Sequence, residues 1–181
     1  MTIMDSQWLE QCREGDILAI EKMVHLYQKD IFRLAFSILD NYDEAEDSTQ
    51  EIFLAALRTL DSFRGDSAFK TWLFSISINV CRSRLRRNKN RNNVLQTLQN
   101  LFQLQGGNEY PENEVIKNEA DTQIWLAIRS LNNKHRIPLI LRYYHDLSVI
   151  DIAAVLGIPP GTVHSRLNHA RNKLHALLKD E

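Results

Sequence analysis

Residues 61–91 place aromatic side chains next to basic ones and end in a run that is almost entirely cationic. The aromatic members could stack on an unpaired base, and the basic members could neutralise a phosphate backbone. The segment has eight basic and two acidic residues, a balance of +6, in a chain whose formal net charge is -1. This pattern favours a site that holds one separated strand of a nucleic acid. The aromatic residues are Phe63, Phe69, Trp72 and Phe74, and the basic ones are Arg64, Lys70, Arg82, Arg84, Arg86, Arg87, Lys89 and Arg91.

The same aromatic residues also fit a buried helix face. Phe69, Trp72 and Ile76 recur at steps of three and four, which is typical of a helix packed against a core. Burial statistics favour the core for Phe69 and Trp72 taken singly. Core packing does not account for the polar loop at 61–67, with Gly65 as its flexible point, or for the dense cationic run that follows. Both interpretations therefore stay open.

A second candidate site lies in residues 148–173, whose layout is that of a helix-turn-helix. A short apolar helix should stop at Gly157, because glycine tolerates the positive φ of a tight interhelical turn. Pro159 and Pro160 should then start the next helix, since their missing N–H groups cost nothing in the first turn. Its outward face offers donors, acceptors and cations for base edges and phosphates in a major groove. That face carries Thr162, His164, Ser165, Arg166, Asn168, His169 and Arg171. A plain helical hairpin with a polar solvent face is the alternative.

Acidic residues crowd between positions 43 and 51. Asp43, Asp47, Gln50 and Glu51 share one helix face at steps of three and four. A di-metal carboxylate site would need Glu-x-x-His pairs on facing helices, and the sequence has none. Interaction with the helix dipole accounts only for the acids in the first turn. A polar row next to an apolar anchor such as Phe53 favours a surface that docks another protein.

No arrangement of residues predicts catalysis. His164, His169 and His175 are five and six positions apart, so they do not share a helix face as a metal-binding pair four apart would. The two cysteines, Cys12 and Cys81, have no CxxC or CxxH neighbours and are too few for a disulfide framework. We therefore expect no enzyme, no catalytic residue, no metal site, no cofactor and no small-molecule substrate, and two reduced cysteines.

The elements that must position these residues are predicted to be helices throughout. The first ninety residues contain no proline, and their apolar residues recur at helical spacing. We expect a first helix over 5–11, a second that starts after an N-cap at Asp16 and runs toward Leu39, and a third over 43–60. A fourth should follow the loop at 61–67 and continue into the cationic run.

The composition then shifts to asparagine and glutamine and reaches Gly106-Gly107, as in a linker. The predicted fold class is all-α, with two small helical domains joined by a linker and a helix-turn-helix in the second. We place the first domain at 1–91, the linker at 92–117 and the second domain at 118–181.

Composition and charge are those of a globular protein. The chain has 181 residues, of which 44% are hydrophobic and 25% charged. No apolar run approaches the roughly 20 residues of a membrane span, and the N-terminus lacks the layout of a signal peptide. We expect a cytoplasmic protein without direct membrane insertion. Formal charge alternates along the chain, from -7 in 1–60 through +6 and -3 to +3 in 132–181, which suggests two nucleic-acid contacts joined by a spacer.

Three blocks of the sequence together resemble bacterial sigma factors of the extracytoplasmic-function (ECF) group of the sigma-70 family. YDEAEDSTQEIFLAAL is similar to the part of region 2 that binds the clamp helices of RNA polymerase. FRGDSAFKTWLFSISINVCRSRLRR is similar to the adjoining part that melts and holds the promoter's -10 element. LILRYYHDLSVIDIAAVLGIPPGTVHSRLNHARNKL is similar to region 4, whose recognition helix reads the -35 element. The blocks occur in the family's order, and the resemblance covers about residues 11–178.

This resemblance implies an alternative sigma factor that binds core RNA polymerase, recognises promoter DNA, melts the -10 element and starts transcription. It also implies an anti-sigma factor as a partner, which could hold the chain at the membrane. The implied polymerase-binding residues are Asp43, Glu46, Asp47, Gln50, Glu51 and Phe53. The implied -10 residues are Ser62, Phe63, Arg64, Gly65, Asp66, Ser67, Lys70, Trp72, Asn79, Arg82, Arg84 and Arg86. The implied -35 residues are Thr162, His164, Ser165, Arg166, Asn168, His169 and Arg171.

The sequence departs from the family's pattern in the recognition helix. Relatives commonly carry arginine where this chain has His164 and His169. Histidine is mostly neutral near pH 7, so we expect weaker and more pH-sensitive attraction to phosphate. The alternative class is a stand-alone helix-turn-helix regulator, with the N-terminal half as a dimerisation or sensor domain. The segment 61–91 argues against it, because a protein that binds only duplex DNA has no use for a strand-holding loop.

Overall fold

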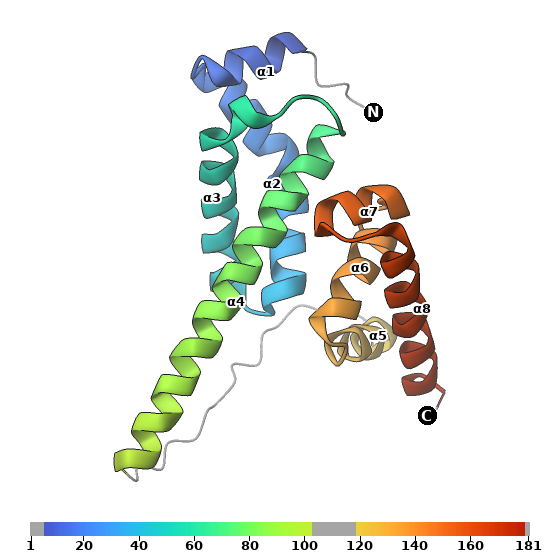
Figure 1. The fold of residues 1–181 in the computed structure, drawn as a ribbon. Helices are drawn as coiled ribbons and strands as arrows, with labels where there is room; N and C mark the ends of the chain where they lie inside the picture. Colours follow the sequence, from blue (N-terminus) through green and yellow to red (C-terminus); the bar gives the residue numbers. More distant parts are fainter. Residues whose placement is uncertain (1–5, 103–118, 180–181) are drawn as a thin grey trace.

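The computed structural model describes residues 6–102 and 119–179, and all the regular structure within these ranges is helical, as predicted (Figure 1). The N-terminal module contains α1 (Ser6–Arg13), α2 (Ile17–Leu39), α3 (Tyr42–Arg58), the short 3-10 helix η1 (Leu60–Ser62) and α4 (Phe69–Phe102). The C-terminal module contains α5 (Glu119–Arg129), α6 (Asn133–Tyr143), α7 (Val149–Leu156) and α8 (Pro160–Leu177). None of these helices combines the length and the apolar content that a membrane span requires.

The N-terminal module is a bundle of α2, α3 and α4, with α1 lying across one end (Figure 1). Helix α2 begins after Asp16, whose carboxylate accepts a hydrogen bond from the Leu18 N–H at 3.0 Å, so the predicted N-cap is confirmed. Asn41 caps α3 in the same way, through the Glu44 N–H at 2.9 Å. The capped helices turn their apolar faces inward, and Ile31 is fully buried in the resulting core.

The C-terminal module contains the predicted helix-turn-helix. Helix α7 begins after its N-cap Ser148, whose hydroxyl accepts a hydrogen bond from the Asp151 N–H at 3.1 Å. It ends before its C-cap Gly157, which has a φ of 63° in the left-handed region. Pro160 is the first residue of α8, where its missing N–H leaves no bond unmade. Val163 is fully buried and anchors α8 against the rest of the module.

Helix α4 is longer than the sequence predicted. The predicted linker starts at residue 92, yet α4 continues to Phe102 and has 34 residues, a length of about 51 Å at 1.5 Å per residue. Asparagine and glutamine lower helix propensity only slightly, so their abundance did not mark a helix end. The remaining residues of the predicted linker, 103–117, lie outside the described residues.

The two modules pack directly on each other, with α7 against α4 and α6 against α2 (Figure 1). The buried hydrophobic residues form one cluster that continues from the first module into the second. This arrangement was not predictable from sequence, because a hydrophobic pattern marks which face of a helix is buried and not what covers that face. We call the contact between the modules the seam.

Candidate nucleic-acid and polymerase interfaces

The predicted strand-holding loop is an exposed turn between η1 and α4. Gly65 has a φ of 82° and open space around its Cα, so it provides the left-handed conformation that reverses the chain. The polar members of the predicted set in this loop, Ser62, Arg64, Asp66 and Ser67, are all exposed. The loop can therefore present side chains and backbone groups to a ligand without rearranging the core.

The aromatic residues behind the loop belong mainly to the core. Phe63, Phe69 and Phe74 have exposed fractions of 8%, 5% and 0%, so the prediction that they offer free stacking faces is corrected. The Phe63 and Phe69 rings meet edge to face at 5.4 Å, and each lies within 5.3 Å of the Trp72 ring. Trp72 is only half-buried. Of these four rings, it is the one that a separated base could reach.

Some cations of α4 already form ion pairs with carboxylates of the chain, and others remain free to contact a phosphate. The Lys70 ammonium pairs with Asp30 at 2.7 Å. The Arg84 guanidinium lies 3.3 Å from the Asp47 carboxylate and 3.9 Å from that of Glu51, so it is committed to the acidic face of α3. Asn79 and Arg86, by contrast, are exposed. Lys70 and Arg84 thus have structural partners that compete with a phosphate.

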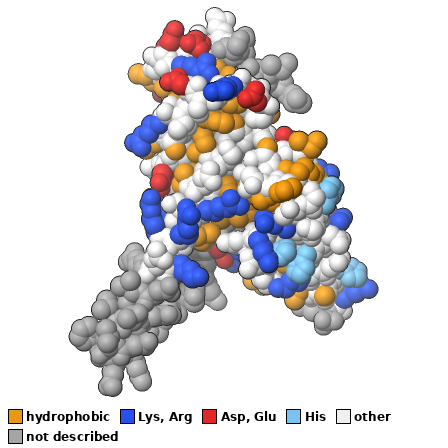
Figure 2. Space-filling view, viewed as in Figure 1, with side chains coloured by type: hydrophobic (Ala, Val, Ile, Leu, Met, Phe, Trp, Pro, Cys, Tyr) orange, Lys and Arg blue, Asp and Glu red, His pale blue; other side chains and the backbone are white. Residues whose placement is uncertain are grey.

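Arg82 is a half-buried cation for which no ion pair is found among the described residues. Burial lowers the pKa of its guanidinium, and the nearby positive charges of Arg166 and Arg86 lower it further. Arg166 belongs to α8, so a cation of each predicted DNA-binding surface faces the other across the seam. Figure 2 shows lysine and arginine side chains on this face gathering over the middle of α4, above the part drawn in grey, and continuing toward α8.

The predicted docking surface lies on α3. Asp43, Glu46, Asp47 and Gln50 are exposed and Glu51 is half-buried, so these polar side chains form one accessible row. We call this row, together with Leu54, the acidic face. Phe53 is only 6% exposed and packs in the core, so we remove it from the predicted contact set. The apolar residue on the surface is Leu54, 54% exposed, four positions after Gln50 and on the same helix face.

Helix α8 carries the second predicted DNA-binding surface. Val163, Leu167 and Ala170 face the module's core, with exposed fractions of 0%, 6% and 0%. The opposite face presents the predicted set. His164, Ser165, Asn168, His169 and Arg171 are exposed, while Thr162 and Arg166 are half-buried.

A residue that the sequence did not reveal supports this surface. The His135 ring, on α6, stacks on the His169 ring with centroids 4.2 Å apart, and its Nδ1 lies 3.4 Å from the Arg166 carbonyl oxygen. Burial is the main reason that the pKa of His135 is lowered, so the neutral ring is favoured. His135 and His169 meet only through the packing of α6 on α8, and no spacing in the sequence indicates the pair.

The turn of the helix-turn-helix provides a matched pair of glycine substitutions. Gly157→Ala should lower the free energy of unfolding by about 1 kcal/mol, because a Cβ is strained at a φ of 63° although nothing lies within 4 Å of it. Gly161→Ala, inside α8 and equally open, should raise it by about 0.5–1 kcal/mol through higher helix propensity. Denaturant titration of both variants measures the effect. Equal shifts in both would contradict a special backbone conformation at Gly157.

Both cysteines are buried free thiols, with exposed fractions of 4% for Cys12 and 0% for Cys81. Burial raises the pKa of Cys81 to about 12. Burial, followed by the charge of Asp16, also raises the pKa of Cys12. Neither thiol is therefore ionised near neutral pH. Among the residues whose side chains are described, no group of three or more His, Cys, Asp or Glu is arranged to hold a metal ion.

An apolar groove of about 560 Å³ opens along the seam. Helix α2 contributes Phe32 and Phe36 to its lining, α5 contributes Trp125, and the C-terminal end of α6 contributes Tyr143 and the capping residue Tyr144. The two tyrosines are 58% and 55% exposed, so the groove carries apolar surface that the chain itself does not cover. It is formed by both modules and exists only while they are packed together.

A helical bundle with a predicted strand-holding loop, joined to a helix-turn-helix, is the architecture of a transcription factor with two specialised modules. Each module matches a known family of domains. Residues 23–91 match Sigma-70 region 2, and residues 121–174 match Sigma-70, region 4.

Relatives with assigned names match almost the whole chain. The ECF RNA polymerase sigma factor SigW of Bacillus subtilis (strain 168) is 32% identical over 99% of this chain and 100% of its own length. The RNA polymerase sigma-H factor of Pseudomonas aeruginosa is 34% identical over 97% of this chain and 94% of its own. The ECF RNA polymerase sigma-E factor of Escherichia coli (strain K12) is 33% identical over 98% and 97%. The chain belongs to the ECF sigma factors of the sigma-70 family, as the sequence resemblance predicted.

Solved structures agree on the fold. The sigma factor RpoE in complex with the anti-sigma factor NepR, from Bartonella quintana, has a TM-score of 0.68 and 28% identity, over 88% of this chain and 96% of that chain. CnrH in complex with the cytosolic domain of CnrY has a TM-score of 0.68 and 25% identity, over 96% of both chains. The similarity includes both modules in each case.

Proposed function

We propose that the chain is an alternative sigma factor that attaches to core RNA polymerase through the acidic face of α3 and directs it to promoters. In this role it performs no catalysis itself. The loop around Gly65 and the adjoining part of α4 hold the opened -10 element, and α8 reads the -35 element. The observation that carries the proposal is the presence, in one chain, of an exposed polar loop before α4 and a helix-turn-helix whose second helix is anchored by buried Val163 and Leu167.

The geometry supports a strand-holding role for the first module. Extruding a base costs a few kcal/mol of lost stacking, which a pocket and phosphate contacts together must offset. The loop from Ser62 to Ser67 supplies exposed polar groups, and Trp72 supplies a half-buried ring behind it. Arg82 and Arg86 are the cations for the backbone. Arg84 instead positions the acidic face against α4, since its guanidinium already meets two carboxylates of α3.

The second module supports duplex reading. A helix docked in a major groove contacts base edges near its N-terminus and phosphates further along. Thr162, His164 and Ser165 occupy the first part of α8, and Arg166 and Arg171 follow. The stack of His135 on His169 fixes one imidazole of this surface in place.

We also propose control by an anti-sigma factor. The similar sigma factor RpoE is seen with the anti-sigma factor NepR, and the similar CnrH with the cytosolic domain of CnrY. The uncovered apolar groove across α2, α5 and α6 supports this proposal, because a partner bound there would contact both modules at once. Such a partner would hold the two DNA-binding surfaces in the packed arrangement.

Reconstituted transcription tests the sigma assignment. Purified chain is added to core RNA polymerase that lacks other sigma factors, and the 5′ ends of RNA made from genomic DNA are sequenced. We expect discrete start positions that share two upstream sequence elements, and none with core alone. A stand-alone regulator would bind duplex DNA without co-eluting with core, and that result would replace the sigma assignment.

If α8 contacts the -35 element, loss of its arginines should weaken promoter binding in a salt-dependent way. Replacing Arg166 and Arg171 with alanine should weaken promoter binding by the assembled holoenzyme about 10-fold or more, because two charge-assisted contacts to phosphate are lost. The slope of log affinity against log salt should become shallower by about 1.8, which corresponds to two phosphates. Filter binding over a salt series measures both quantities. The control is Lys179→Ala, an exposed cation beyond the end of α8. An unchanged slope would place the recognition face elsewhere.

A further inference from the structure

The exposed His169 ring of α8 lies on a second imidazole, which a neighbouring helix supplies. It stacks on the half-buried ring of His135 of α6, with centroids 4.2 Å apart and ring planes inclined by 27°. Helices α6 and α8 pack on each other, and Ile137 of α6 and Val163 of α8 are only 3% and 0% exposed. The stack lies inside the C-terminal module, so it does not depend on the contact with the N-terminal module.

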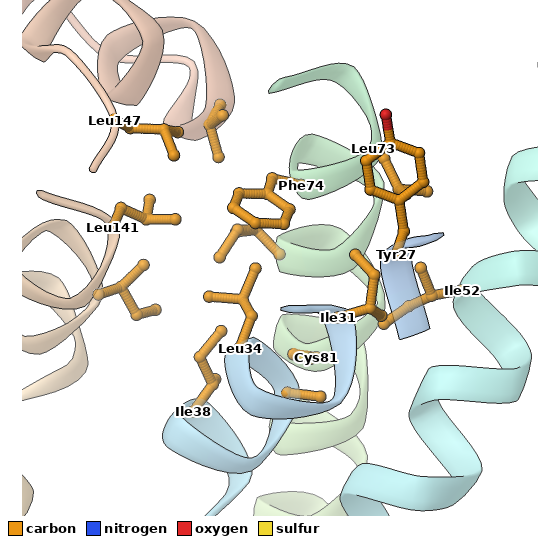
Figure 3. Packing of buried hydrophobic residues seen from close by; sticks show 14 of the residues in the cluster. Tyr27, Ile31, Leu34, Ile38, Ile52, Leu73, Phe74, Cys81, Leu141 and Leu147 are labelled. Atoms are coloured by element: carbon orange, nitrogen blue, oxygen red, sulfur yellow. The ribbon is translucent and has the colours of Figure 1, made fainter. Parts of the chain in front are cut away.

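The far end of α6 is also held in place. Leu141 is fully buried, and in Figure 3 its side chain points toward Phe74 of α4. His145, just after the helix, is 6% exposed and meets the Phe74 ring edge to face, with centroids 4.8 Å apart. Because α6 is anchored along its length, it presents His135 as a rigid support that limits the orientations open to His169.

The two helices that form the stack are basic. Neither α6 nor α8, both described in full, contains an aspartate or a glutamate. The charges that act on His135 are those of Lys134, Arg166 and His169 itself. On α8, Lys173 follows His169 by four positions and therefore lies on the same helix face. A positive charge on His169 is thus surrounded by groups of the same sign.

The other helices that pack on α8 do not compensate this charge. They are α5 and α7. Among the described side chains of α5, the charged one is Arg129, which pairs with Asp40. Helix α7 carries the carboxylate of Asp151, which accepts a hydrogen bond from the Ser148 hydroxyl at 2.6 Å. An anion that approaches the stack from outside would therefore supply the missing negative charge.

The two rings are not equivalent as sites for a proton. Burial is the main reason that the pKa of His135 is lowered, so this ring stays neutral. Its Nδ1 lies 3.4 Å from the Arg166 carbonyl oxygen, which can only accept a hydrogen bond, so the proton of the neutral ring belongs on Nδ1. A neutral aromatic face stabilises a cation placed over it. His169 is consequently the ring that can take up a proton and remain accessible.

We propose that the stack is a proton-linked contact to a DNA phosphate, in which protonated His169 binds the phosphate and neutral His135 is the positioning residue beneath it. This inference rests on the proposed reading of the -35 element by α8. A phosphate favours the protonated ring, so the complex holds a proton that the free chain does not, and affinity rises as the pH falls. At lower pH the stack gives α8 the cation that relatives commonly carry as arginine.

The pH dependence of promoter binding tests the proposal. Affinity of the assembled holoenzyme for a promoter located by RNA 5′-end sequencing is measured at pH 8 and pH 6, at constant salt. His135→Leu removes the aromatic face, His135→Phe keeps a face that cannot be protonated, and His169→Arg makes the charge permanent. The matched control is His175→Gln, an exposed position on α8 outside the predicted contact set. Because other histidines also contribute, the ratio of the two affinities is compared between variants.

The wild type should bind at least about 5-fold more tightly at pH 6 than at pH 8. His135→Leu should lower this ratio at least about 2-fold through weaker binding at pH 6, because the cation loses its aromatic support. His169→Arg should lower the ratio by a similar factor through tighter binding at pH 8. His135→Phe and His175→Gln should keep the wild-type ratio.

Two results would overturn the proposal. Equal losses of affinity at both pH values in His135→Leu would show that His135 has only a structural role. A wild-type ratio in His169→Arg would show that another ring gains the proton.

Failure of the sigma function would be a separate result, seen if the wild-type holoenzyme neither binds promoters nor initiates. The contact is then tested with the free chain and a random-sequence duplex at low salt, because every duplex offers phosphates. The same ratios are expected there, and the same two results would refute the phosphate contact.

Discussion

Reversing Asp47 and Glu51 to lysine is expected to weaken association with core RNA polymerase by at least about 30-fold, or about 2 kcal/mol. Both carboxylates belong to the acidic face, where Asp47 is 69% and Glu51 44% exposed at the side chain. Two charge reversals replace attraction by repulsion at a surface that a basic partner must approach. Titration of fluorescent chain with core polymerase measures the change.

The ion pairs of Arg84 require a design that separates binding from folding. Lysines at positions 47 and 51 would repel the Arg84 guanidinium and could loosen α3 from α4. The neutral variant Asp47→Asn with Glu51→Gln removes the attraction without adding repulsion, and should show a smaller loss of affinity. Glu21→Lys, an exposed acid on α2, is the control for net charge. Unchanged affinity in a folded reversal variant would contradict the assignment of the acidic face.

Acidification should destabilise the packed chain through His145. Burial, assisted by Lys70 and Arg33, lowers the pKa of His145 to about 4. The ordinary pKa of histidine is about 6.5, so between these values the unfolded chain binds a proton that the folded chain does not. The stabilisation from the neutral imidazole is therefore fully present above about pH 6.5 and is lost as the pH falls toward 4. It amounts to at most about 3.5 kcal/mol, because each pKa unit is worth about 1.4 kcal/mol.

Substitution isolates this contribution from the other titrating groups. His145→Leu keeps an apolar side chain beside Phe74 and removes the titration, so its free energy of unfolding should fall less between pH 6.5 and 4 than that of the wild type. Denaturant unfolding at several pH values measures the difference. His25→Leu, an exposed position on α2, should follow the wild-type curve. Parallel curves for His145→Leu and the wild type would show that another group causes the pH dependence.

The features that could be predicted from sequence are those set by local chemistry. The Asp16 side chain can cap the N-terminus of a helix, and Gly157 can adopt the left-handed backbone conformation that ends one. Each residue therefore predicted a helix terminus correctly. The outward face of α8 followed from the spacing of Val163 and Leu167, which must turn inward together. The acidic row on α3 followed from the same periodicity. These inferences needed no knowledge of what the helices pack against.

The features that could not be predicted depend on tertiary contacts. Phe53 and Leu54 are adjacent apolar residues, and only the packing of α3 on its neighbours decides that the first is buried and the second exposed. Arg84 lay within a cationic run, but the fold places it beside the acids of α3. Arg136 and His145 carried no signal, because their partners are on α2 and α4, which lie far away in the sequence.

The placement of the two cysteine thiols restricts how an oxidative stress could act on this protein. Oxidants such as peroxide attack the thiolate, and attack it only where they have access. Cys12 and Cys81 are the chain's two cysteines; both are buried, and both have raised pKa values. The folded chain is therefore a poor redox sensor. An oxidative signal that changes its activity must be received by another molecule and relayed to it through binding.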